Sequence, residues 1–119
     1  NIRLIIVGSG TEIKSIKKFI NTNNLSKNIL LVGYKTSEKY FKRSGIFVLN
    51  SLWEGLPNIL IETQMLKTPI ISSNCESGPN EILINGKLGY LTPVDNEKKL
   101  ATKIIYVLEN YHEAKHKQN

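Results

Sequence analysis

Residues 4–10 read Leu-Ile-Ile-Val-Gly-Ser-Gly, and this stretch decides the class of fold. Its four aliphatic residues form an unbroken run, which is typical of a strand that is covered on both faces. Residues 11–21 follow with apolar side chains three or four positions apart between Ile13 and Ile20. This is the spacing of an amphipathic helix. A covered strand that passes through a glycine-rich turn into a helix predicts parallel α/β architecture.

The same alternation continues along the chain. Further strands are expected at residues 29–32, 46–49, 69–72 and 89–91, and further helices at residues 37–43, 57–67, 80–84 and 96–114. Repeated strand–helix units predict parallel strands joined by helical crossovers. We therefore expect an α/β fold, with a Rossmann-like parallel sheet that carries helices on both faces, in a single domain over residues 1–119.

Two local expectations concern the ends of helices. Thr36 or Ser37 is expected to cap the helix over residues 37–43, because short hydroxyl side chains favour that position. Apolar residues become rare after His112, so disorder is expected from there to Asn119.

Composition limits the kinds of partner. The chain carries 16 Lys and Arg against 10 Asp and Glu, a net charge of +6, which favours anionic partners. The basic residues are scattered and no nucleic-acid-binding motif is present, so nucleic acid is not an expected partner. No apolar run approaches the roughly 20 residues of a membrane-spanning helix. Cys75 is the one cysteine, which fits the reducing cytoplasm.

The most informative loop covers residues 51–58, Ser-Leu-Trp-Glu-Gly-Leu-Pro-Asn, between a predicted strand and a helix. Ligands of parallel sheets bind beyond the carboxyl ends of strands. A helix start offers free N–H groups and a partial positive charge, which suit a phosphate. Gly55 permits close backbone approach, and Pro57 removes only a donor that would be unpaired. Residues 8–10 and 33–35 follow two other strands in the same way.

Two carboxylates in this region have alternative interpretations. Glu62 lies in a helix that is apolar on most sides, four residues after Asn58 and on the same face. A covered carboxylate needs a partner, and a pair of sugar hydroxyls could provide it. The alternative is that Glu62 points to solvent. Glu54 could cap the helix or form a loop hydrogen bond to free N–H groups, or it could hold a polar ligand group beside the phosphate. Spacing alone does not choose between these interpretations.

The stretch from Glu54 to Glu62, Glu-Gly-Leu-Pro-Asn-Ile-Leu-Ile-Glu, resembles the Glu-seven-residues-Glu signature of family 4, group 1, retaining glycosyltransferases of GT-B fold. The resemblance continues in the same order along the chain. Its other segments are residues 4–10, 29–35, 68–71, 78–82 and 85–91. The resemblance implies that the chain is the C-terminal, donor-binding half of such an enzyme.

Site residues follow from this resemblance. It implies that Glu62 accepts hydrogen bonds from the donor's ribose, and that Glu54 lies beside the donor sugar as the candidate catalytic residue. The segment around Pro57 would face the sugar and diphosphate through the backbone amides of Gly55, Leu56, Asn58 and Ile59. Tyr34 and Lys35 would flank the base, and Gly8 and Gly10 would let the chain pass close to the nucleotide. No metal and no cofactor is implied.

The implied reaction transfers a hexose or N-acetylhexosamine from a nucleotide sugar, by expectation UDP-linked, to a polysaccharide or lipid-linked acceptor. Residues 76–81, Glu-Ser-Gly-Pro-Asn-Glu, are similar to enzymes that build bacterial lipopolysaccharide and capsule. A cytoplasmic location is expected, peripheral at the inner face of the membrane, because the basic charge suits an anionic surface.

Departures from the family pattern lead to three expectations. The family's diphosphate-binding Arg and Lys, its first strand and its acceptor-binding N-terminal domain have no counterpart from Asn1 onward. We therefore expect the chain alone to be inactive. The loss of the first strand, which lies mid-sheet in the family, would leave two exposed strand edges. Such edges favour self-association.

Two other functions fit the same fold. A nucleotide-sugar epimerase would carry extra acid–base His and Asp residues in these loops, and none is seen. A non-catalytic module could bind a nucleotide or a membrane surface, but Glu54 and Glu62 would repel an anionic surface.

Overall fold

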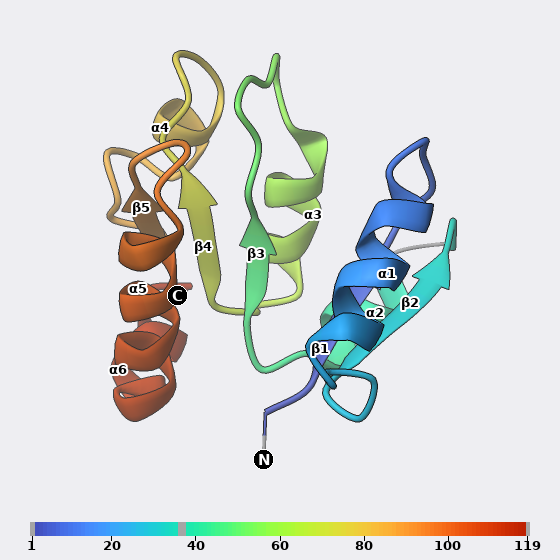
Figure 1. Ribbon diagram of the computed structural model, residues 1–119. Helices are drawn as coiled ribbons and strands as arrows, with labels where there is room; N and C mark the ends of the chain where they lie inside the picture. The colour runs from blue at the N-terminus through green and yellow to red at the C-terminus, as the bar shows by residue number, and fades with distance from the viewer. Residues whose placement is uncertain (1, 36–37, 119) are drawn as a thin grey trace. The chain divides into compact units, whose positions relative to one another are not determined.

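The computed structural model describes residues 2–35 and 38–118 (Figure 1). The chain divides into two compact units, Asn1–Ser37 and Glu38–Asn119, and each is described by itself. Thr36 and Ser37, the expected helix caps, lie outside the described residues.

The first unit is a two-stranded parallel sheet with one helix. It contains β1 (Leu4–Val7), α1 (Ile13–Thr22) and β2 (Ile29–Gly33). The strands pair in parallel from Leu4 opposite Ile29 onward, as expected for two strands joined by a helical crossover. Ile20 of α1 is buried, at 6% exposure. The two predicted strands and the predicted helix of this region are confirmed.

The second unit holds a three-stranded parallel sheet in the order β3-β4-β5. Its elements are α2 (Glu38–Arg43), β3 (Phe47–Leu49), α3 (Asn58–Met65), β4 (Ile70–Ser73), α4 (Pro79–Ile82), β5 (Tyr90–Thr92), α5 (Glu97–Glu109) and α6 (Tyr111–His116). β4 is central and is buried at all four residues. Its position explains why its sequence is continuously buried rather than alternating.

Neighbouring residues of β4 enter different cores on the two faces of the sheet. Ile71 packs with Tyr90 and with Val107 of α5, whereas Ile70 packs with Leu60 of α3 and with Leu83. Successive side chains of a strand point to opposite faces, so one strand supplies both clusters. The prediction of an α/β sheet with helices on both faces is confirmed in this unit.

The described strands form two sheets rather than one continuous sheet. β1 pairs only with β2, and β3 pairs only with β4, among the residues that the structure describes. β1 and β3 therefore each have an edge that is not bonded to a described strand.

The end of the chain differs from expectation. The predicted helix over residues 96–114 is interrupted at Asn110 (φ −114°), where α5 gives way to α6. The expected disorder after His112 is wrong for the described residues up to Gln118. Ala114 is fully buried, Lys117 Nζ donates to the Gly86 carbonyl (2.9 Å), and Gln118 Nε2 donates to the Leu88 carbonyl (2.7 Å). These partners lie far back in the sequence, so apolar content near the terminus could not indicate them.

Tyr90 links stability to pH. Burial raises the pKa of its hydroxyl above the ordinary 10.0, and the negative charge of Glu113 adds to the shift. A raised pKa in the folded state means that folding favours the neutral hydroxyl. The contribution of Tyr90 to the free energy of unfolding is therefore fully present below about pH 10 and is lost as pH rises through the raised pKa. We expect the free energy of unfolding to fall less between pH 8 and pH 10.5 in Tyr90→Phe than in the wild type. Urea denaturation at both pH values measures this fall. An equal fall in the variant and the wild type would show that Tyr90 is not the source of the pH dependence.

Candidate functional site

The loop before α3 and the first turn of α3 present unused backbone donors. None of the described residues accepts a hydrogen bond from the amides of Gly55, Leu56, Asn58 or Ile59. The first bond of the turn runs from the Leu60 amide to the Pro57 carbonyl (2.9 Å), and no side chain caps the helix. The amides of Asn58 and Ile59 are free donors of the helix start, and those of Gly55 and Leu56 add free donors from the loop just before it, which together suit an anion. The sequence prediction of a phosphate-compatible helix start is therefore consistent with the backbone geometry.

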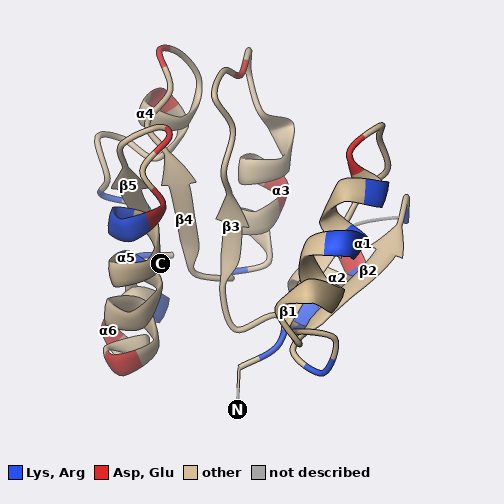
Figure 2. Ribbon diagram, viewed as in Figure 1, with Lys and Arg blue, Asp and Glu red and all other residues tan. Residues whose placement is uncertain are grey.

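Glu54 does not cap α3. Its side chain is half-buried, and its Oε1 accepts a hydrogen bond from Ser51 Oγ (2.6 Å). Its backbone carbonyl accepts another from Ser77 Oγ (3.0 Å). Figure 2 shows acidic residues at the tips of the loops that follow β3 and β4, and Glu54 is the acidic residue of the first of these loops. The capping interpretation of Glu54 is wrong, whereas its role toward a ligand stays a prediction.

Gly78, which precedes α4, packs directly against the candidate site. It is buried with a left-handed backbone (φ +87°). A Cβ at this position would lie 2.3 Å from the Gly55 carbonyl oxygen and 2.6 Å from Pro57 Cδ. Only glycine satisfies both the backbone angle and the close approach. The loop after β4 therefore sets the position of the segment that carries the free amides.

Glu62 is exposed, so the expectation that neighbouring apolar residues cover it is wrong. α3 buries Leu60 and Thr63 completely, while Ile61 (40% exposed) and Met65 (79% exposed) lie on the uncovered side with Glu62. The helix packs through one stripe only, although its sequence is apolar on most sides. Glu62 therefore needs no protein partner. Its carboxylate is accessible to a ligand, and Asn58, which is also exposed, shares its face as predicted.

The remaining predicted site residues lie in the first unit, at the ends of β1 and β2. The Gly8 amide donates to the Gly33 carbonyl (2.9 Å), which joins the two glycine turns. A Cβ added at Gly8 or Gly10 would meet no atom within 4 Å, so internal packing does not require glycine there. Tyr34 (85% exposed) and Lys35 also lie at the surface. Their roles toward a nucleotide stay predictions.

Sequence reasoning assigned no role to the serines that contact this loop. Ser51 and Ser77 bond Glu54, and Ser73, at the end of β4, bonds the backbone of Ser51. The one available signal was that each follows or ends a strand, on the side of the sheet where ligands bind. Their partners are 3 to 23 residues away, so spacing could not identify them.

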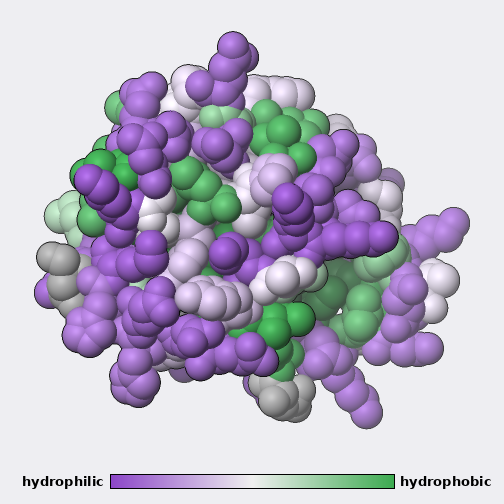
Figure 3. Space-filling model, turned by 90° about the vertical axis from the view of Figure 1, so that its left-hand side faces the viewer, coloured by the Kyte–Doolittle hydropathy of each residue, from purple (hydrophilic) through white to green (hydrophobic). Residues whose placement is uncertain are grey.

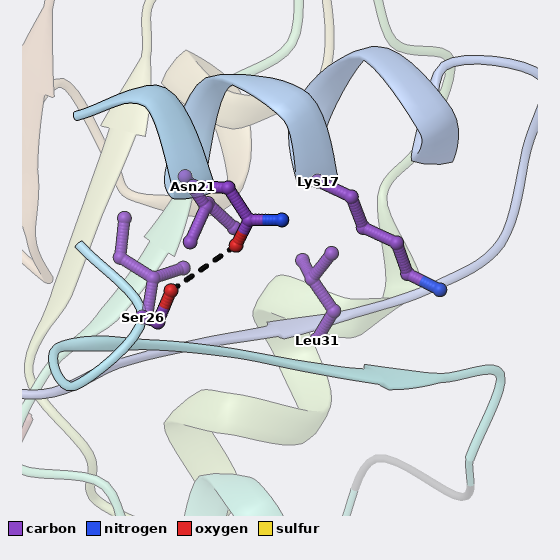
Figure 4. A pocket seen from close by; sticks show the side chains of 6 residues that line it. Lys17, Asn21, Ser26 and Leu31 are labelled. Atoms are coloured by element: carbon purple, nitrogen blue, oxygen red, sulfur yellow. Dashed lines mark hydrogen bonds between the residues drawn. The ribbon is translucent and has the colours of Figure 1, made fainter. Parts of the chain in front are cut away.

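Neither of two hollows in the described parts of the chain coincides with the candidate site. One of about 250 Å³ lies between α1 and β2 and is lined by Lys17, Asn21, Ser26 and Leu31 (Figure 4). Asn21 and Ser26 bond each other across it (3.2 Å). A second hollow of about 410 Å³ lies beyond the carboxyl ends of β4 and β5. Neither contains Glu54 or Glu62 in its lining.

One face of the molecule is largely hydrophilic. Hydrophilic side chains cover most of the face in Figure 3, with hydrophobic ones between them. No helix within residues 2–35 and 38–118 is long and apolar enough to cross a membrane. Within the same residues, no three His, Cys, Asp or Glu side chains are grouped so that they could hold a metal ion.

The chain is similar in sequence to known glycosyltransferases. The family model described as "Glycosyl transferases group 1" matches residues 1–119. An uncharacterized glycosyltransferase of Methanocaldococcus jannaschii is 44% identical over 96 residues, covering 76% of this chain and 24% of that protein. The Escherichia coli UDP-Gal:alpha-D-GlcNAc-diphosphoundecaprenol alpha-1,3-galactosyltransferase is 32% identical over 108 residues, covering 89% of this chain and 28% of that protein.

Among solved structures, a variant of TarM from S. aureus in complex with fondaparinux, alpha-GlcNAc-glycerol and UDP superposes with a TM-score of 0.88 at 29% identity. The match covers 98% of this chain and 24% of the TarM chain. It confirms the expected α/β architecture of a GT-B glycosyltransferase domain. The chain thus spans about a quarter of the length of these relatives.

Proposed function

This chain belongs to the group 1 glycosyltransferase family, and on that premise we propose that it is the donor-binding part of a retaining glycosyltransferase. The proposed donor is a UDP-linked hexose or N-acetylhexosamine, and the acceptor is a polysaccharide or a lipid-linked sugar. Relatives support these classes, because one is named for UDP-galactose and a diphosphoundecaprenol acceptor, and another is solved with UDP.

One observation carries the proposal: the start of α3 combines free backbone amides with an accessible carboxylate one turn later. The amides of Gly55, Leu56, Asn58 and Ile59 have no acceptor among the described residues. They suit the diphosphate, whose charge a helix start attracts. The exposed Glu62 suits a pair of ribose hydroxyls, which donate hydrogen bonds to a carboxylate.

The same arrangement supports group transfer. When the bond between the sugar and the diphosphate breaks, negative charge grows on the departing UDP. Donors that already point at this charge lower the barrier, because they need no reorganisation during the reaction. In this proposal Glu54, four residues before the helix, interacts with the sugar side of the donor. Retention of the anomeric configuration is part of the proposal and is supported by the family resemblance.

A nucleotide panel tests the proposal. In an NMR titration of the chain, we expect UDP or GDP to bind more tightly than ADP, and to shift the amides of Gly55 to Ile59. A single-stranded RNA of mixed sequence and vesicles of anionic phospholipid serve as comparisons for a general preference for negative charge. Equal binding of ADP, RNA and UDP, or no response from the start of α3, would contradict the proposal.

Several finer features belong to the proposal. Donor binding is independent of metal ions, so EDTA leaves the affinity for UDP unchanged. A location at the inner, anionic face of the membrane accords with the net charge of +6. Self-association through strand edges stays a prediction.

A further inference from the structure

We propose that Ser51 is a positioning residue that holds the Glu54 carboxylate toward the donor sugar, and that Ser73 fixes Ser51 in turn. This inference rests on the proposed function of the site and deepens it. It concerns three side chains at the ends of two adjacent strands, β3 and β4.

The contact between Ser51 and Glu54 sets one carboxylate oxygen and leaves the other free. Ser51 Oγ donates to Glu54 Oε1 at 2.6 Å, which is the short distance of a hydrogen bond to a charged acceptor. No described residue donates to Glu54 Oε2. A glutamate side chain that is not held samples several rotamers, so this contact orders it before any ligand arrives.

Ser73 anchors this arrangement to the core. Its side chain is 1% exposed, at the carboxyl end of the fully buried β4. Its hydroxyl donates to the Ser51 carbonyl (2.6 Å) and accepts from the Ser51 amide (3.0 Å). One buried hydroxyl thus holds both backbone polar groups of Ser51. The position of Glu54 is therefore tied to the central strand of the sheet rather than to a free loop.

The rest of the loop is restrained by the segment that follows β4. Ser77 Oγ donates to the Glu54 carbonyl (3.0 Å), and Gly78 abuts the Gly55 carbonyl and Pro57. The exposed tip between these supports, Leu52 and Trp53, has no such bonds among the described residues. Within this loop two side-chain hydrogen bonds therefore converge on Glu54. A pre-ordered carboxylate loses less entropy when the sugar binds.

Ser51→Ala tests the role of the hydroxyl through binding. The affinity for UDP-N-acetylglucosamine or UDP-glucose, measured by calorimetry, should fall about five- to tenfold, as expected when one hydrogen bond is lost. The affinity for UDP should change less than about twofold, because Glu54 faces the sugar. Ser51→Thr keeps a hydroxyl and should restore the affinity for the UDP-sugar. Ser44→Ala removes a comparable bond, to the Tyr40 carbonyl, far from the loop and should change neither affinity.

Two results of the binding experiment would overturn the proposal. One is that Ser51→Ala weakens UDP and UDP-sugars equally, which would mean that Ser51 only supports the loop. The other is that Ser51→Ala costs as much in a Glu54→Ala background as in the wild type, because a positioning residue must act through Glu54.

A ligand-free measurement separates this inference from the proposed function. Three-bond NMR couplings of Glu54 should report one dominant χ1 rotamer in the wild type and averaging in Ser51→Ala and Ser73→Ala. If the wild type fails to bind UDP, the proposed function fails, yet the couplings still decide whether Ser51 orders Glu54. A Glu54 side chain that already averages in the wild type overturns the positioning role.

Discussion

Gly78→Ala is expected to destabilise the second unit by about 2–4 kcal/mol, the largest stability effect that we predict. The methyl group would meet the Gly55 carbonyl oxygen at 2.3 Å and Pro57 Cδ at 2.6 Å, and the backbone would keep a left-handed angle that alanine resists. Both contacts are to parts of the chain that cannot rotate away, so the loop before α3 must move. Urea denaturation measures the loss. A titration with UDP should show weaker binding in the fraction that stays folded.

Gly86→Ala is the matched control. Gly86 also has a left-handed backbone (φ +82°), but an added Cβ would find its nearest neighbour, the Gly89 carbonyl oxygen, at 3.8 Å. The Gly86→Ala variant should lose only the free energy that alanine costs in a left-handed backbone, about 1 kcal/mol, and should bind UDP as the wild type does. The difference between the two variants isolates the contact with Gly55 and Pro57. Equal losses of stability in the two variants would show that this contact does not restrain the loop.

Glu62→Ala is expected to give the largest loss of affinity, about 10- to 100-fold for UDP, without a change in stability. A carboxylate that accepts two hydrogen bonds from ribose contributes about 1.5–3 kcal/mol for each, part of which water recovers. The melting temperature should stay within about one degree, because Glu62 is exposed and α3 is held by Leu60 and Thr63. Calorimetric titration and thermal unfolding of the same sample provide both numbers.

A control for charge accompanies this variant. Glu109→Ala removes another exposed carboxylate, at the end of α5, and should leave the affinity for UDP unchanged. UDP lacking its ribose 2′-hydroxyl should bind the wild type more weakly, but should bind Glu62→Ala about as well as UDP does. An unchanged affinity in Glu62→Ala would show that the ribose assignment is wrong, whatever the rest of the site does.

Much of the fold could be predicted because strands in a parallel sheet have a strong local signal. β1 and β2 are apolar runs that lead into a glycine, β4 reads Ile-Ile-Ser-Ser after a proline, and each of the three lies within two residues of its predicted bounds. The break at Asn110 and the attachment of Lys117 and Gln118 could not be predicted in this way. They depend on carbonyl groups of Gly86 and Leu88, about 30 residues away in the sequence.

Only the local features of the candidate site could be predicted from the sequence. The residue types of the loop from Glu54 to Glu62 and its place before a helix are local, so the amides at the helix start could be anticipated. The exposure of Glu62 could not, because Ile61 and Met65 look like core residues until the packing of α3 is known. The roles of Ser73 and Gly78 could not be predicted from the sequence either. Both residues contact the loop between β3 and α3, which precedes them by more than 20 residues.

The sequence by itself determined the strand–helix order, the parallel class of fold and the loop that carries the candidate chemistry. These depend on apolar periodicity and on turn residues, which act between near neighbours in the chain. Only the tertiary structure decided which side of α3 faces solvent, what holds Glu54, and how the C-terminal residues attach. Those features arise from contacts between segments that are distant in the sequence, and such contacts follow from packing rather than from spacing.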